Sequence, residues 1–296
     1  MNSSVCPEES SSGQIRRLKP QEFEAIRLLA YKEFGLDLRR GKEELVAARL
    51  SKLLRQGGFT SFEEYYRHVT SDRSGKALIG LIDALATNHT SFLREMPHFE
   101  FLRAQVLPGL RGRTRVDIWS AACSTGEEPY SLAFTLCDAW GAEAFRNVRI
   151  LATDISTKAL AVATNATYPS QRFVNDLPAA WLPQFFLRGE GRWKGWYRVK
   201  PGVRGLVEFA RLNLVEPFSH GNLFPVIFCR NVMIYFDNPT QELLINRLAE
   251  CLEPAGYLFI GHSESLTGVR HSLACVRPAI YQKPGAVANR GVKWPT

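Results

Sequence analysis

The stretch that decides the fold is residues 116–131, VDIWSAACSTGEEPYS. An apolar run, Val116–Trp119, leads into small residues and Gly126, and a helical pattern follows. This order is typical of the first strand, first turn and first helix of a nucleotide-binding α/β fold. The small residues allow a ligand to approach the backbone closely. The stretch therefore predicts a cofactor site at the turn.

Two acids, Glu127 and Glu128, open the predicted helix, and the turn lacks the Gly-Lys-Ser/Thr ending of a phosphate-binding loop. Carboxylates would repel a pyrophosphate at a helix N-terminus, where an anion is otherwise favoured. They suit a positively charged cofactor such as S-adenosylmethionine, which carries a sulfonium and an ammonium group. A second interpretation stays open, in which the two acids only complement the helix dipole.

Composition limits the class of protein. The chain has 296 residues, 45% of them hydrophobic, and a net charge of +8, which indicates an acidic partner: nucleic acid, a membrane surface or an acidic protein face. The six cysteines form no Cys-x-x-Cys pair, so neither a zinc motif nor a thioredoxin-like motif is indicated. Met1–Gly13 does not resemble a signal peptide, and no apolar run reaches membrane-spanning length. We expect a cytoplasmic protein without membrane insertion.

The pattern of apolar residues divides the chain. Phe23, Ile26 and Leu29 recur at helical spacing, and Ser61 with Glu64 predicts a capping box that begins another helix. The expected parts are a disordered tail (1–13), an all-helical domain (14–86), an α/β domain (87–284) and a flexible tail (285–296).

The α/β domain is predicted from alternating strand-like and helix-like segments. The strand-like runs are Val116–Trp119, Val148–Thr153, Val207–Leu212, Val226–Cys229 and Tyr257–Ile260. The helical patterns between them include Glu128–Trp140, Thr157–Ala166 and Pro239–Leu252. Such alternation favours a Rossmann-like fold, a mostly parallel sheet with helices on both faces.

Residues 170–206 do not fit this alternation. Five glycines lie between Gly189 and Gly205, interleaved with aromatic and basic residues, which predicts a small antiparallel β insertion. Its surface would suit stacking on unpaired bases or capture of a peptide along a strand edge. A third interpretation is a hairpin that packs its own tryptophans.

Polar residues stand where the predicted strands end. In open α/β sheets ligands bind beyond the carboxyl ends of the strands. Asp154 follows the second strand and is placed to accept hydrogen bonds from ribose hydroxyls, or else to cap the next helix. Asn213-Leu214 and Arg230-Asn231 follow two further strands. Each could cap a helix, but their joint occurrence in register with the strands favours a cofactor site.

Other candidate groups are less specific. Arg94 could orient a carboxylate with its guanidinium fork, or form a surface ion pair with Glu95 or Glu100. Residues 261–265 are expected to form a turn that lines the cleft rather than part of a catalytic triad. No metal site is predicted, because the histidines are too dispersed for metal-ligand spacing: His89, His98, His220 and His262.

Five segments in this order resemble the CheR family, the chemotaxis receptor methyltransferases. They are TNHTSFLRE (87–95), SAACSTGEEPYS (120–131), ATDIS (152–156), IFCRNVMIYFD (227–237) and GHSESL (261–266). The resemblance extends from about residue 15 to about residue 284, and segments of this length are far more specific together than a short glycine motif. Leu93 and Ala255 depart from the family pattern, but neither is assigned to the chemistry.

The resemblance implies an S-adenosylmethionine-dependent methyltransferase that esterifies glutamate side chains of receptor cytoplasmic helices and releases S-adenosylhomocysteine. By position, it implies that Arg94 and Tyr235 lie beside the transferred methyl group. It also implies the cofactor-binding residues Asn88, Thr90, Arg94, Ala122, Glu128, Asp154, Asn213, Leu214, Arg230 and Asn231.

The resemblance also implies how receptors are bound. Family members have a basic docking helix, and Arg49, Lys52 and Arg55 match it and share part of a helix face, although an ordinary solvated face would look the same. Members that dock on a receptor C-terminal tail carry a Gly-x-Gly turn in the insertion, which Gly189 and Gly191 match. Such a tether would raise the effective substrate concentration. Acidic receptor helices, rather than nucleic acid, would account for the positive charge.

A glutamate acceptor is already ionised near neutral pH, so the reaction needs no general base. The rate would come from alignment of the reactants and removal of water, with Arg94 aligning them and Tyr235 shaping the methyl channel. One rival function is a nucleic-acid methyltransferase, but such enzymes often carry Asp/Asn-Pro-Pro-Tyr/Phe where this chain has Asn231-Val232-Met233-Ile234. The other rival is a non-catalytic binding module, against which Arg94, Glu128 and Asp154 argue.

Overall fold

The computed structural model describes residues 17–173 and 177–285. The predicted tail at residues 1–13 and nearly all of the predicted tail at 285–296 lie outside the described residues. The chain divides into two compact units: the first runs up to Glu33 and continues over Leu38–Ala86, and the second comprises Phe34–Asp37 and the chain from Thr87 onward.

The first unit is helical, as predicted. Its helices are α1 (Pro20–Phe34), α2 (Glu43–Gly57), α3 (Phe62–Ser71) and α4 (Lys76–Leu85). Ser61 caps α3 by accepting from the Glu64 N–H (3.2 Å), but the Glu64 carboxylate bonds the Thr60 N–H (2.9 Å) instead of closing the predicted capping box on Ser61. Buried apolar side chains at helical spacing, such as Val46 and Leu50, form its core.

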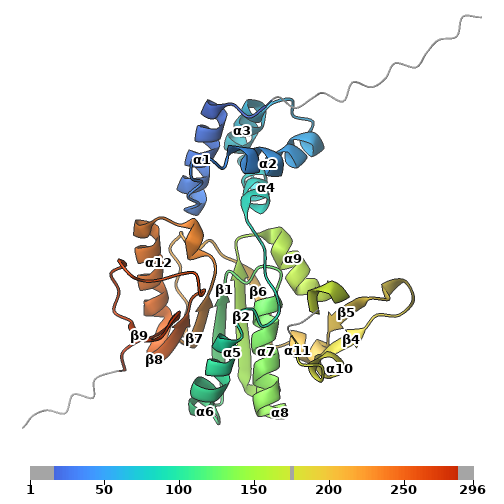
Figure 1. The fold of residues 1–296 in the computed structure, drawn as a ribbon, viewed down its shortest axis with the longest axis vertical. Helices are drawn as coiled ribbons and strands as arrows, with labels where there is room; N and C mark the ends of the chain where they lie inside the picture. The colour runs from blue at the N-terminus through green and yellow to red at the C-terminus, as the bar shows by residue number, and fades with distance from the viewer. Residues whose placement is uncertain (1–16, 174–176, 286–296) are drawn as a thin grey trace, which may run out of the picture. The chain divides into compact units, whose positions relative to one another are not determined.

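The second unit is built on a seven-stranded sheet with the order β6-β2-β1-β7-β8-β10-β9 (Figure 1). The strands are β1 (Val116–Ala121), β2 (Val148–Asp154), β6 (Val207–Arg211), β7 (Phe224–Cys229), β8 (Leu252–Phe259), β9 (Ala274–Arg277) and β10 (Ile280–Gln282). The first five pair in parallel, and β10 and β9 add antiparallel pairs at one edge. The predicted mostly parallel sheet is confirmed.

Helices cover both faces of this sheet, again as predicted. Successive residues of a strand point to opposite faces, so Ile118 of β1 joins one core cluster while Trp119 joins the other. The first cluster includes residues of α7 (Glu127–Trp140), α5 (Pro97–Phe101), the π-helical turn η1 (Leu102–Val106), α6 (Leu107–Leu110) and α8 (Ala142–Asn147). Helix α9 (Thr157–Asn165) packs against β2 and β6. The second is covered by α12 (Asn238–Cys251), which contributes Leu248.

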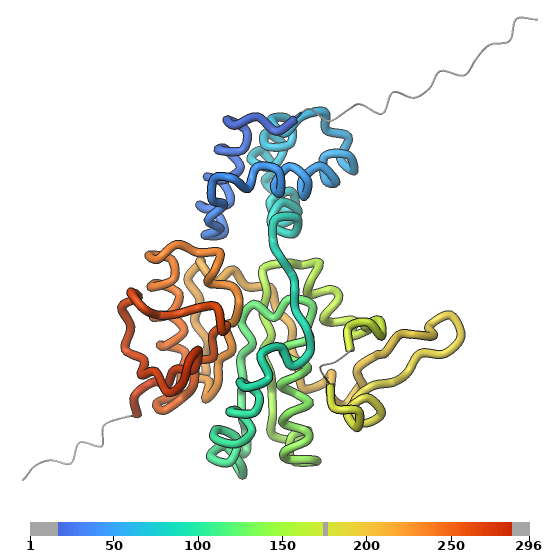
Figure 2. Tube along the Cα trace, viewed as in Figure 1, coloured from blue at the N-terminus to red at the C-terminus, as the bar shows by residue number. Residues whose placement is uncertain are grey.

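The β insertion is a three-stranded antiparallel sheet with the order β3-β5-β4. Its hairpin of β4 and β5, yellow in Figure 2, projects away from the rest of the second unit. Its elements are β3 (Thr167–Pro169), η2 (Ser170–Phe173), α10 (Trp181–Phe185), β4 (Phe186–Arg188), η3 (Gly191–Trp193), β5 (Trp196–Val199) and α11 (Pro201–Arg204). Trp193 and Trp196 meet edge to face but are 51% and 38% exposed. The two tryptophans therefore pack against each other, as in the third interpretation, but both rings stay exposed.

Within the two described ranges, none of the helices combines the length and the apolar character that crossing a membrane would require.

Candidate cofactor site at the carboxyl edge of the sheet

The predicted turn connects β1 to α7 and is held by backbone hydrogen bonds. Cys123 N donates to Thr153 O at the end of β2 (2.8 Å), and Ala122 and Ser124 both have left-handed backbone conformations (φ of +69° and +50°). Gly126 also has a positive φ, and a Cβ there would lie 2.8 Å from the Ala163 Cβ, so only glycine fits against α9. The turn is a tightly constrained platform at the carboxyl end of β1.

The two acids that open α7 have different environments. Glu127 is fully buried, accepts from Thr125 Oγ1 (2.6 Å) and pairs with Arg172 (3.1 Å). Glu128 accepts from Ser120 Oγ (2.7 Å) and Arg230 Nη1 (3.0 Å). Burial raises the pKa of both carboxyls, against the opposing effect of these partners. Each acid therefore belongs to a side-chain network in addition to its place at the helix N-terminus.

Arg230, at the end of β7, is the centre of the second network. Its side chain is only 1% exposed and pairs with Glu95 (2.9 Å) and Glu128 (3.0 Å), while Nη2 also donates to the Arg94 carbonyl. The guanidinium lies 5.8 Å from the ring centre of Phe99 and 5.7 Å from that of Phe228. Arg230 thus joins the segment at Arg94-Glu95 to the start of α7.

The Glu95 carboxyl stays ionised even at pH values well below neutral. Burial disfavours its charged form, but Arg230, Asn231 Nδ2 and the His262 N–H all stabilise the carboxylate and lower its pKa from 4.5 to about 2. The hydrogen bonds measure 3.2 Å from Asn231 and 3.1 Å from His262. One carboxylate therefore links three segments that are far apart in the sequence.

Asp154 connects the end of β2 to the turn after β1. Its two oxygens accept from the backbone N–H groups of Ser124 and Ser156, each at 2.8 Å, and the residue is 7% exposed. The alternative role as the helix cap is wrong, because Ser156 caps α9 by accepting from Ala159 N (3.1 Å). The contact of Asp154 with a ribose stays a prediction.

The remaining predicted residues lie on neighbouring segments. Asn213 is 4% exposed and donates to Glu216 (2.8 Å), and Leu214 packs in the core beneath α12, which leaves mainly its backbone for a ligand. Asn88 and Thr90 border the β1–α7 turn: Ser124 Oγ donates to Asn88 O (3.1 Å) and Arg172 donates to Thr90 O (3.2 Å).

The two residues predicted to lie beside the transferred methyl group are each held by a hydrogen bond to a distant part of the chain or a neighbouring turn. Arg94 Nη1 donates to the His89 carbonyl (2.9 Å), while the adjacent Glu95 pairs with Arg230. Tyr235 ends the short helix η4 (Met233–Tyr235), is half-buried, and its carbonyl accepts from Asp37 N (2.8 Å).

Asn231, directly after Arg230, has a left-handed conformation (φ of +57°) and is fixed by two acids. Its backbone N–H donates to Glu264 (2.9 Å) and its amide to Glu95 (3.2 Å). Sequence reasoning assigned neither acid: Glu95 was considered only as a partner of Arg94, and Glu264 only as part of a turn. Both acids lie inside segments that carry the family resemblance, 87–95 and 261–266, and this position could have marked them as site residues.

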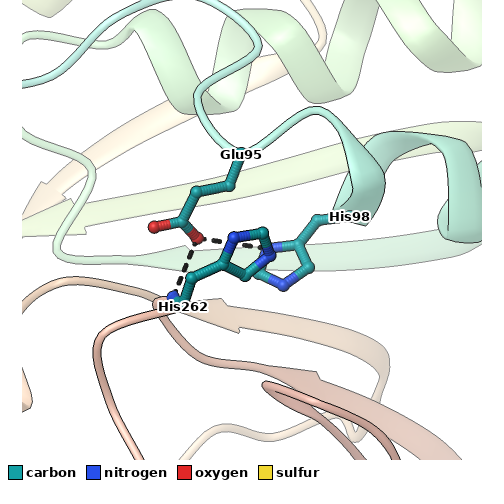
Figure 3. Close-up of side chains that lie close together, drawn as sticks. All are labelled: Glu95, His98 and His262. Carbon is teal, nitrogen blue, oxygen red and sulfur yellow. Dashed lines mark hydrogen bonds and ion pairs between the residues drawn. The ribbon is translucent and has the colours of Figure 1, made fainter.

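Figure 3 shows a cluster that the sequence spacing concealed, Glu95, His98 and His262. The imidazoles of His98 and His262 lie 4.5 Å apart between ring centres, a proximity that their spacing in the sequence does not indicate. His98 is buried with neither ring nitrogen hydrogen-bonded, and burial lowers its pKa to about 3, so it is neutral at physiological pH. The three residues offer atoms within 4.8 Å of one another, but the Arg230 cation beside Glu95 opposes the binding of a metal ion.

The predicted receptor-binding residues lie on two other surfaces. On α2, Lys52 and Arg55 are exposed, whereas Arg49 is half-buried and donates to the Leu85 carbonyl at the end of α4. In the insertion, a Cβ on Gly189 would lie 2.3 Å from the Trp193 carbonyl, and Gly191 has a positive φ of +53°. The Gly-x-Gly pattern is therefore required by this turn.

Comparisons with known proteins agree with this arrangement. The model of the CheR methyltransferase SAM-binding domain matches residues 88–281, and that of the CheR all-alpha domain matches residues 21–86. Chemotaxis protein methyltransferase 2 of Pseudomonas aeruginosa is 41% identical over 262 residues, covering 88% of this chain and 92% of that one.

Two further relatives are the chemotaxis protein methyltransferases of Borreliella burgdorferi and Escherichia coli. The first is 39% identical, with 88% of this chain and 94% of that chain covered, and the second is 37% identical, with 89% and 91% covered. The chain therefore belongs to the CheR methyltransferase family and is an S-adenosylmethionine-dependent protein methyltransferase.

Proposed function

We propose that the enzyme transfers the methyl group of S-adenosylmethionine to glutamate side chains of chemoreceptor cytoplasmic helices, giving glutamate methyl esters and S-adenosylhomocysteine. It would act in the cytoplasm, in the adaptation step of bacterial chemotaxis. The observation that carries the proposal is the meeting of Arg94-Glu95, Glu128, Asp154 and Arg230-Asn231 at one edge of the sheet. The names of the relatives, chemotaxis protein methyltransferases, support the pathway.

The groups at this edge fit a cofactor with hydroxyl groups and positive charge. Asp154 would accept from the ribose hydroxyls, the Ala122–Gly126 turn would contact the cofactor closely, and Glu128 would favour its positive groups. Asn88, Thr90, Asn213, Leu214 and Asn231 would complete the site. Arg230 would act mainly by holding Glu95 and Glu128 in place, because its guanidinium already binds both. The bound cofactor supplies an activated methyl group on a sulfonium.

A carboxylate acceptor suits the chemistry of these residues. Glu95 is committed to Arg230, and Glu264 accepts backbone N–H groups, so neither acid is placed as a general base. An ionised glutamate needs none, and its attack depends on alignment. Arg94, anchored on the His89 carbonyl through one nitrogen, would use its other N–H groups to orient the acceptor. Tyr235 would shape the channel through which the methyl group passes.

Two surfaces would bring the receptor to the site. Lys52 and Arg55 on α2 present exposed positive charge to acidic receptor helices, and Arg49 would support this face from its contact with Leu85. The insertion, with its Gly189–Gly191 turn and exposed tryptophans, would bind a receptor C-terminal tail by a strand edge. Such a tail would raise the local substrate concentration without adding contacts at the active site.

The test is transfer of radiolabelled methyl groups from S-adenosylmethionine to receptor-containing membranes, followed by mild alkali. Label released as methanol identifies a methyl ester and so a carboxylate acceptor. Alkali-stable label would overturn the proposal in favour of an amine or nucleobase acceptor. Cofactor binding without any transfer would overturn it in favour of a non-catalytic binding module.

A further inference from the structure

One buried carboxylate, that of Glu264, joins the ends of two neighbouring strands. It accepts four backbone N–H groups: Gly261 (2.6 Å), Asn231 (2.9 Å), Met233 (2.8 Å) and Ile234 (3.4 Å). Three of these donors lie in the loop after β7, and Gly261 lies in the turn after β8, the strand that pairs with β7. The residue itself is 9% exposed.

The converging backbone N–H groups need a side chain that accepts several hydrogen bonds and donates none. An ionised carboxylate offers two oxygens and no donor, so it can bind several converging N–H groups. A glutamine would place its NH₂ group against some of those N–H groups and leave buried donors unsatisfied. The chemistry of the loop thus specifies a carboxylate at position 264.

The loop itself is strained where it meets the predicted cofactor residues. Asn231 has a φ of +57°, in the left-handed region that asparagine tolerates better than most other non-glycine residues but that is still less favourable than a right-handed or extended backbone. Glu264 holds its N–H, and Glu95 holds its side-chain amide. Gly261 packs so closely that a Cβ there would lie 2.4 Å from Asn231 Nδ2 and 2.9 Å from Glu264 Oε2.

We infer that Glu264 is a positioning residue of the methyltransferase reaction: its carboxylate holds Asn231 in the left-handed conformation and sets the path of the loop to Tyr235. The inference rests on the proposed roles of Asn231 at the cofactor and Tyr235 at the methyl channel. Glu264 acts through these two residues, because its own oxygens are occupied by backbone N–H groups.

The experiment compares full-length variants by two measurements, the Kd of S-adenosylmethionine from titration calorimetry and the kcat of methyl transfer to receptor membranes. Glu264→Gln is expected to weaken cofactor binding at least tenfold and to lower kcat further. Glu264→Asp keeps the charge and is expected to recover part of both. Leu248→Ala, on the buried face of α12, lowers the melting temperature by creating a cavity and is expected to leave the Kd unchanged.

A second variant perturbs the same contact without removing the acid. Gly261→Ala inserts a methyl group between Asn231 and Glu264, and the same loss of cofactor affinity is expected. The inference is overturned if both Glu264→Gln and Gly261→Ala bind the cofactor like the wild type, or if Leu248→Ala at equal destabilisation loses as much affinity. The Kd is measured without receptor, so alkali-stable label from the wild type would overturn the proposed acceptor and leave this inference standing.

Discussion

A single buried cation, Arg230, organises the acids around the candidate site. It lies between Glu95 and Glu128 with its side chain 1% exposed, and a buried guanidinium needs such partners to offset the loss of hydration. Arg230 sits at the end of the strand where the sequence predicted a cofactor residue. The structure adds that its first contacts are with protein carboxylates.

The first prediction concerns the pH dependence of the Glu95 ion pair. The pKa of Glu95 falls from 4.5 to about 2 on folding, so the pair stabilises the fold above about pH 4.5, and this stabilisation is lost as the pH falls toward 2. Glu95→Gln should reduce the free energy of unfolding by about 3 kcal/mol at pH 7, because it leaves the buried Arg230 cation with Glu128 as its one carboxylate partner. The difference from wild type should shrink below pH 4.5.

Urea unfolding at pH 7, 4 and 3 would measure this difference. The control is Glu143→Gln, which removes the charge from a loose pair with Arg111 (3.7 Å) but keeps an oxygen to accept from the Gly112 N–H (3.0 Å), so it should change stability little at any pH. A gap between Glu95→Gln and wild type that stays constant from pH 7 to pH 3 would contradict the assignment.

The second prediction concerns Arg94. Its anchoring on the His89 carbonyl suggests a guanidinium held ready for an acceptor carboxylate. Arg94→Ala should lower kcat by about 100-fold, the scale expected when reactants lose alignment, while the fold stays intact. Arg94→Lys should recover only part of the loss, since an ammonium cannot form a bidentate contact. Turnover of Arg94→Ala close to wild type, with unchanged circular dichroism, would eliminate Arg94 from the mechanism.

At the scale of elements, the sequence predicted what depends on local pattern. The strands β1, β2, β6, β7 and β8 were visible as apolar runs, and α7 and α9 as helical patterns between them. The strands β9 and β10 were missed, because the edge strand β9 is exposed throughout and β10, between β8 and β9, spans only three residues, too few to show a periodic pattern.

The networks of the site were missed for a different physical reason. Glu95 meets Arg230 across 135 residues of sequence, and Glu264 meets Asn231 across 33. Pairing at such separations is decided by the order of strands in the sheet, which brings the ends of β7 and β8 together, and not by any local spacing. The sequence could predict which residues stand at strand ends, but not which of them bind each other.

The third prediction concerns the Gly189–Gly191 turn of the insertion. Gly189→Ala places a Cβ 2.3 Å from the Trp193 carbonyl and must change the turn. Binding of a receptor C-terminal tail peptide should weaken at least fivefold, while the Kd of S-adenosylmethionine stays the same. The matched control is Gly80→Ala in α4, where a Cβ meets nothing within 4 Å. Unchanged peptide binding by Gly189→Ala would remove the turn from tail recognition.

At the scale of the whole molecule, charge should govern the encounter with the receptor. The chain carries a net charge of +8, and receptor methylation helices are expected to be acidic, so long-range attraction would raise the rate of association. Salt screens this attraction, with a Debye length of about 10 Å at 0.1 M and shorter at higher ionic strength. The KM for receptor should therefore rise as salt increases from about 50 to 300 mM, while kcat changes little.

The fourth prediction assigns this salt dependence to α2. The double variant Lys52→Glu with Arg55→Glu should raise the KM for receptor at low salt and flatten its dependence on salt, since both side chains are exposed there. Arg73→Glu, an exposed position of the same helical unit outside α2, makes the same kind of charge change and should shift the curve only slightly. If both variants lower the salt dependence of KM only in proportion to the change in net charge that each makes, the net charge of the chain, and not α2, attracts the receptor.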